Sequence, residues 1–193
     1  MECWTGLGWI ESIRMAFELI RFIRKMRTVT PMRAGGLVSR ECNSLWMNDY
    51  YGMLVHATPQ DVQSFITFWF QYSPQSPRVY PKSDTCSRQK SLIPPPPTHF
   101  VFTHQGLAPR NILLDKHLKL WLVDWQSARF YPQYFEYVGM QSFHCRAWTS
   151  INRLRWWIFS WISVGIYSRE LRGLERVREF SLSNIFGDLW CLE

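Results

Sequence analysis

Apolar residues recur every three or four positions in several stretches of the chain, as in a helix with one buried face. The spacing predicts helices over residues 9–27, from 59 to about 73, over about 149–166 and over about 168–180. In the first helix, the expected buried face carries a regular series of large apolar side chains, namely Ile10, Ile13, Phe17, Ile20 and Ile23, which Met26 continues.

Two helix starts are marked by their residue types. Thr58, Pro59 and Asp61 predict the beginning of the second helix, because a capping threonine, an early proline and an acid three residues after the cap are typical of helix N-termini. An aromatic helix is expected after residue 131, with Pro132 in its first turn and a buried side formed by Tyr134, Phe135, Val138 and Phe143.

Three short apolar runs predict β-strands around a polar loop. The first covers residues 100–102, and the second and third cover 112–114 and 118–123. The last two are separated by Asp115, Lys116 and His117, which suit a tight turn, so we expect a small hairpin. A proline-rich and serine-rich linker over about 73–98 precedes these strands, and it lies inside one expected domain of residues 1–193.

The polar loop has an ordered set of functional residue types. His104, Leu107 and Asn111 fall at the spacing of the pattern H-x-D-L-x-x-x-N, and Asp124 follows at the end of the hairpin. In kinases, this pattern is the catalytic loop, and the later aspartate binds metal. Gly106 stands at the position of the catalytic aspartate, and the neighbouring Gln105 is neutral.

The stretches THQ-x-LAPRNILLD, L-x-L-x-DW and FYPQYFEYVGM closely resemble the aminoglycoside phosphotransferase family, in the form common among fungal members. The resemblance implies an α+β, predominantly helical chain with the large lobe of a protein-kinase-like fold and a small β-hairpin at the catalytic loop. It also implies that the N-terminal lobe, which would precede the first helix, is missing. The family reaction is ATP-dependent phosphorylation of a small-molecule hydroxyl.

The same resemblance assigns roles to residues. Asn111 and Asp124 would bind Mg²⁺ and, through it, ATP, while His104 and Arg110 would shape the loop. Gly106 has no side chain to accept the hydroxyl proton, and general-base assistance is worth about 10²–10⁴ in rate. We therefore expect a degenerate phosphotransferase, with retention of Mg²⁺ and ATP as an open question.

Composition narrows the class of protein. The 193 residues are 47% hydrophobic and 17% aromatic, which favours a packed chain over disorder. The net charge of +7 is read as a solvated basic surface, and nucleic acid is not expected as a partner.

The five cysteines are scattered, so neither a disulfide framework nor a zinc site is expected. The sequence shows neither a targeting signal nor an apolar run long enough to span a bilayer, which predicts a cytoplasmic protein.

Three alternatives remain open from the sequence. The chain could be an active small-molecule kinase completed by an N-terminal lobe or by a partner chain. It could be a non-enzymatic interaction module that uses its basic, aromatic surface. It could also be a truncated product that folds poorly, because loss of a lobe exposes apolar surface. The small-molecule substrate and the oligomeric state are not predicted.

Overall fold

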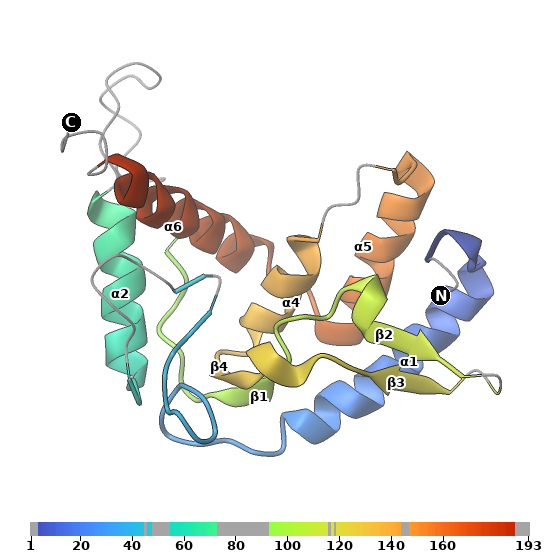
Figure 1. The fold of residues 1–193 in the computed structure, drawn as a ribbon, viewed down its shortest axis with the longest axis horizontal. Helices are drawn as coiled ribbons and strands as arrows, with labels where there is room; N and C mark the ends of the chain where they lie inside the picture. Colours follow the sequence, from blue (N-terminus) through green and yellow to red (C-terminus); the bar gives the residue numbers. More distant parts are fainter. Residues whose placement is uncertain are drawn as a thin grey trace. The chain divides into compact units, whose positions relative to one another are not determined.

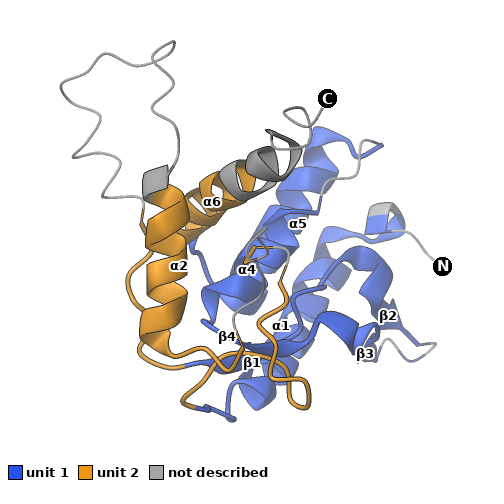
Figure 2. Ribbon diagram, turned by 60° about the vertical axis from the view of Figure 1, so that its left-hand side comes forward, with its two compact units in different colours: residues 1–31, 100–167 blue, residues 32–99, 168–193 orange. Residues whose placement is uncertain are grey.

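The computed structural model describes residues 4–44, 46–47, 55–72, 93–115, 117, 119–143 and 147–187, and most of the expected linker lies outside these ranges. The chain forms two compact units, which Figure 2 colours separately. Unit 1 contains residues 1–31 and 100–167, and unit 2 contains residues 32–99 and 168–193. The expectation of one domain over residues 1–193 stays a prediction.

Unit 1 combines helices with short strands, labelled in Figure 1. Its helices are α1 (Trp9–Met26), α4 (Tyr134–Gln141) and α5 (Ser150–Val164), and its strands are β1 (Val101–Thr103), β2 (Ile112–Leu114), β3 (Leu120–Leu122) and β4 (Arg129–Tyr131). Helix α5 packs against both α1 and α4. Three 3-10 turns, Trp4–Gly6, Pro109–Asn111 and Trp125–Ser127, connect these elements.

The strands form two small antiparallel pairs. β1 pairs with β4, with Val101 opposite Tyr131, and β2 pairs with β3, with Leu113 opposite Trp121. The expected turn of the β2–β3 hairpin is organised by Asp115, whose Oδ1 accepts the amide protons of His117 at 2.8 Å and Lys119 at 2.9 Å. The hairpin is therefore confirmed, whereas β4 was not predicted.

The buried face of α1 differs from the predicted one. Ile10 is 83% exposed and Phe17 is 58% exposed, and Ile13 also faces solvent. The buried positions are Ser12, Met15, Ala16, Leu19 and Ile23. Small side chains at Ser12 and Ala16 permit close packing against another helix, and α1 packs against α5. The prediction was right at Ile23 and wrong at Ile10, Ile13 and Phe17, because spacing was read from the large apolar side chains alone.

An aromatic cluster forms part of the core of unit 1. The Trp156 ring centroid lies 5.0 Å from that of Trp4 and 5.3 Å from that of Phe159, with Trp148 and Phe143 alongside. Arg155 fixes the 3-10 turn before α1 by donating to the carbonyl oxygens of Trp4 and Leu7. These contacts join residues near the start of the chain to α5.

Unit 2 contains α2 (Pro59–Tyr72) and α6 (Ser168–Gly187), which pack against each other. The predicted cap of α2 is confirmed, because Asp61 N donates to Thr58 Oγ1 at 3.2 Å and Thr58 N donates to Asp61 Oδ2 at 2.8 Å. Hydrogen bonding to Thr58 holds the pKa of Asp61 below its usual value. Helix α6 continues to Gly187, beyond the predicted end near residue 180.

The coarse fold class is confirmed as α+β and predominantly helical. Helix α5 begins directly after Thr149, close to the predicted start near residue 149, and the Thr149 side chain caps it by accepting from Asn152 N. Helix α4 begins at Tyr134, so Pro132 precedes the helix instead of lying in its first turn, and its carbonyl oxygen accepts from Phe135 N at 3.0 Å. Within the described residues, every helix is too short or too polar to cross a lipid bilayer.

Candidate functional site

The site is built on the loop that follows β1, and α4 holds the backbone of this loop. The amides of His104 and Gln105 donate to the two carboxyl oxygens of Glu136, at 2.7 Å and 3.0 Å. Two successive amides directed at one carboxylate fix the path of the chain as it leaves the strand. Glu136 is therefore the residue that positions the loop.

Glu136 is buried at the centre of unit 1. Burial raises the pKa of its carboxyl group to about 7, although the His104 and Gln105 amides and the nearby Arg27 guanidinium act in the opposite direction. Arg27, which directly follows α1, donates to the carbonyl oxygen of Val164 at 3.3 Å and is thereby tied to the end of α5. The charge of Glu136 is thus sensitive to pH near neutrality.

Glu136 should make unit 1 less stable as pH rises. Its pKa is about 7 in the folded chain against an ordinary value of 4.5, so the folded state binds a proton more tightly. The stabilisation is complete below pH 4.5 and is lost as pH rises to about 7, for a total of about 3 kcal/mol. Chemical denaturation between pH 4.5 and 8 measures this dependence.

Glu136→Gln removes this titration, so its free energy of unfolding should lack that part of the pH dependence. The variant should also be less stable by about 1–3 kcal/mol at low pH, because its NH₂ group cannot accept from a loop amide. Glu175→Gln, on the exposed side of α6, is the control. Burial lowers the pKa of His104, so His104 makes the folded state less stable as pH falls, which is opposite in sign to the effect of Glu136. His104 acts in this way in both the unaltered chain and Glu136→Gln, so the difference between their pH dependences isolates Glu136. An unchanged pH slope in Glu136→Gln contradicts the assignment.

His104 ties the loop to the end of β3. Its Nε2 lies 3.0 Å from the carbonyl oxygen of Val123, and its Nδ1 accepts the Gly106 amide at 3.2 Å. These partners assign the neutral form with the proton on Nε2. Burial lowers the pKa of His104, which favours the same neutral form. The imidazole therefore holds two backbone segments together.

Asn111 connects the glycine of the loop to the acid at the end of the hairpin. Its Nδ2 donates to the carbonyl oxygen of Gly106 at 2.8 Å and to Asp124 Oδ2 at 3.3 Å. Asn111 is buried in the 3-10 turn before β2, and Asp124 is exposed after β3. The fold therefore brings Gly106, Asn111 and Asp124 together.

Two site residues adopt left-handed backbone conformations. Gln105 has φ of 58° and Asp124 has φ of 66°. Non-glycine residues take this conformation at a cost, and such residues gather at functional sites. The Gln105 amide donates to the Glu136 carboxylate, and the Asp124 carboxylate accepts from Asn111 Nδ2. The surrounding hydrogen bonds fix this backbone shape.

The oxygens of this site suit a hard cation. Because both hydrogen bonds of the Asn111 side chain to the described residues leave from Nδ2, its Oδ1 stays available, and Asp124 Oδ1 is likewise unused by the described residues. Mg²⁺ prefers oxygen ligands and keeps several water molecules, so two protein oxygens are sufficient. The described residues contain no cluster of three His, Cys, Asp or Glu side chains suited to a metal ion.

The remaining predicted residue, Arg110, lies apart from this group. It is exposed, and its guanidinium carbon is 6.0 Å from the ring centroid of Phe143. Glu136, in contrast, belongs to the site and was missed, because a single acid in an aromatic helix resembles a solvent-facing residue. The signal that could have identified it is its position among buried neighbours on both sides, Tyr134 to Val138.

Comparison of the chain with models of known protein families, with curated proteins and with solved structures finds no match in any of the three.

Proposed function

We propose that this chain carries a phosphotransferase-like site that binds Mg²⁺ and the phosphates of a nucleotide but transfers phosphate inefficiently. One observation carries the proposal. The Asn111 amide bridges the carbonyl oxygen of Gly106 and the carboxylate of Asp124, at 2.8 Å and 3.3 Å. The bridge supports the proposal, because Gly106, which stands where the resembled family has its base, lies beside two residues whose oxygens suit a cation.

Each residue has a distinct task in this proposal. Asn111 Oδ1 and Asp124 would hold Mg²⁺, which when bound neutralises phosphate charge. His104 fixes the end of β3 to the loop, so that Asp124 and Gly106 keep their separation. Glu136 fixes the loop from the other side through the amides of His104 and Gln105. In this proposal the loop is thus held from two sides, by His104 and by Glu136.

The position of the base lacks a proton acceptor. Gly106 has no side chain, and the Nδ1 atom of the adjacent His104 is occupied by the Gly106 amide. The Gln105 amide Nε2 donates to the carbonyl oxygen of Ser127 at 3.3 Å, which directs this side chain away from proton transfer. An acceptor hydroxyl at this site would therefore lose its proton without help from the protein, and catalysis is slow.

Asp124→Asn tests the metal side. Asparagine tolerates the left-handed backbone of this position, so the variant removes charge with little change of shape. In calorimetric titrations with ATP, binding by the unaltered chain should require Mg²⁺, and Asp124→Asn should weaken it at least about tenfold.

Glu175→Gln, which removes an acid from the exposed side of α6, should bind as the unaltered chain does. The proposal fails if the unaltered chain shows no Mg²⁺-dependent binding of ATP, or if Asp124→Asn binds as tightly as the chain itself.

A further inference from the structure

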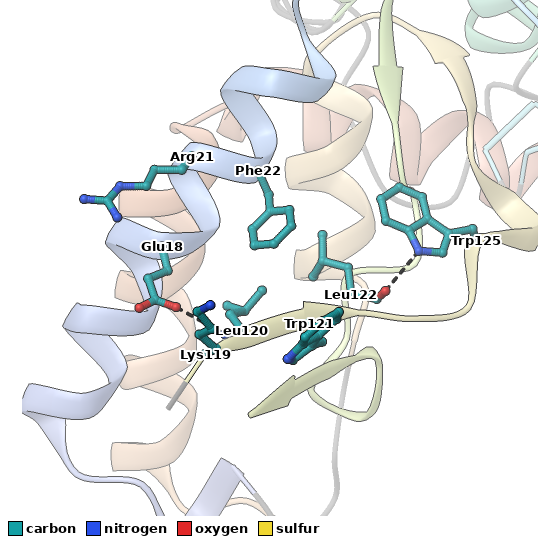
Figure 3. Close-up of a pocket in the computed structure, with 8 residues that line it drawn as sticks. All are labelled: Glu18, Arg21, Phe22, Lys119, Leu120, Trp121, Leu122 and Trp125. Atoms are coloured by element: carbon teal, nitrogen blue, oxygen red, sulfur yellow. Dashed lines mark hydrogen bonds between the residues drawn. The ribbon is translucent and has the colours of Figure 1, made fainter. Parts of the chain in front are cut away.

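A pocket of about 430 Å³ lies between α1 and the edge of β3 that faces away from β2. Its lining combines aromatic, aliphatic and charged side chains, namely Glu18, Arg21, Phe22, Lys119, Leu120, Trp121, Leu122 and Trp125. In Figure 3, Phe22 extends from α1 toward Leu120 and Leu122 of β3, and Trp125 stands at the other end. Asn111 and Asp124 do not line it, so the pocket is separate from the candidate phosphate site.

The hydrogen-bond ladder shows which backbone groups face this pocket. Val123 N donates to the carbonyl oxygen of Asn111, and Asp115 N donates to that of Lys119, both at 3.0 Å. Hydrogen bonding to the partner strand alternates along an antiparallel strand, so positions 119, 121 and 123 bond to β2. The amide and carbonyl groups of Leu120 and Leu122 therefore point to the α1 side.

Two of these four groups already have partners. Leu120 N donates to Glu18 Oε2 at 3.2 Å, and the carbonyl oxygen of Leu122 accepts from Trp125 Nε1 at 3.0 Å, as the dashed lines in Figure 3 mark. The carbonyl of Leu120 and the amide of Leu122 have no hydrogen-bond partner among the described residues. They are neighbours on the strand edge, so they form one acceptor and one donor side by side.

The side chains beside this donor–acceptor pair of Leu120 and Leu122 suit a flat ring. Phe22, Trp121 and Trp125 line the pocket and are partly exposed. Burial of an aromatic face against another ring is favourable, so a ligand that covers these side chains would be stabilised. Lys119 and Arg21 are exposed, and in Figure 3 Arg21 extends away from β3. The single acid, Glu18, already accepts a hydrogen bond from the strand. The inner part of the pocket therefore favours an uncharged aromatic group.

We propose that this pocket binds a planar heteroaromatic lactam, in which a ring N–H lies next to a carbonyl oxygen. The N–H would donate to the carbonyl of Leu120, the ring carbonyl would accept from the amide of Leu122, and the ring would lie among Phe22, Trp121 and Trp125. An added peptide strand fits less well, because β3 has three residues, one open donor–acceptor pair, and α1 beside it.

The test uses 2-quinolone as the probe and the unaltered full chain. Calorimetry should give saturable binding with a Kd below about 1 mM, in keeping with a small, efficient ligand. In a chain labelled with ¹⁵N-leucine, the Leu122 amide proton should shift downfield on titration. N-methyl-2-quinolone lacks the donor and should bind about tenfold more weakly, because the carbonyl of Leu120 is then left without a partner.

Phe22→Ala tests the aromatic wall, and Phe17→Ala is its matched control on the same helix, because Phe17 is exposed outside the pocket. Phe22→Ala should weaken binding about tenfold, and Phe17→Ala should leave it unchanged. The proposal is overturned by absence of saturable binding, by equal affinity for the N-methyl compound, by an unmoved Leu122 amide, or by equal losses in the two variants. The comparison of the two quinolones needs no variant, so it stands even if Phe22→Ala does not fold.

Discussion

Gly106→Asp should raise the rate of phosphate transfer from ATP by a factor between about 10² and 10⁴, the usual worth of a general base. The new carboxylate would project from a loop already fixed by His104 and Glu136. A Cβ atom at position 106 would lie 3.5 Å from Asn111 Nδ2, which is ordinary contact, and 3.3 Å from His104 Nδ1, so the His104 ring would have to shift by a few tenths of an ångström. Transfer is measured with radiolabelled ATP and a panel of hydroxyl compounds that includes aminoglycosides.

Gly106→Ala is the matched control, because it adds the same Cβ atom without a carboxylate. It should leave the rate of transfer at the level of the unaltered chain. Equal rates for the aspartate and alanine variants, in the presence of Mg²⁺ and ATP, would show that a missing base is not what limits this site. Rapid transfer by the unaltered chain would contradict the proposed inefficiency directly.

Trp156→Ala should lower the free energy of unfolding of unit 1 by about 3–5 kcal/mol, the usual cost of removing a buried aromatic side chain. Trp156 is 4% exposed and contacts Trp4, Phe143, Trp148 and Phe159. Its Nε1 also donates to the carbonyl oxygen of Met140 at 3.0 Å, so the substitution leaves an acceptor of α4 without this partner. Urea denaturation followed by circular dichroism measures the change.

The neighbouring tryptophan provides the control. Trp157 lies on the outer side of α5 and is 39% exposed, so Trp157→Ala should cost less than about 1 kcal/mol. Similar losses for the two variants would mean that the aromatic cluster around Trp156 does not stabilise unit 1.

Local patterns predicted the elements whose cause is local. Thr58 and Asp61 fix the start of α2 through hydrogen bonds within four residues, and Asp115 fixes the hairpin turn in the same way. The matching spacing of His104, Asn111 and Asp124 was used to group them, and the short β2–β3 hairpin brings Asp124 back beside Asn111.

Other features depend on partners distant in sequence, and local patterns did not predict them. The buried side of α1 is set by its packing on α5, which favours Ser12 and Ala16 over Ile10 and Phe17. Strand β4 exists because Arg129–Tyr131 meets β1, which lies far earlier in the chain. The role of Glu136 depends on two amides from the loop, at His104 and Gln105.

The left-handed backbone at Asp124 has an evolutionary consequence. Glycine takes this conformation without steric cost and asparagine tolerates it, whereas most other side chains would be strained there, so the replacements that this backbone accepts most readily are ones that remove the carboxylate. An acid at position 124 is therefore expected to be lost early under neutral drift. Sequences descended from this one without a demand on the site should lose Asp124 before they lose the hairpin that carries it.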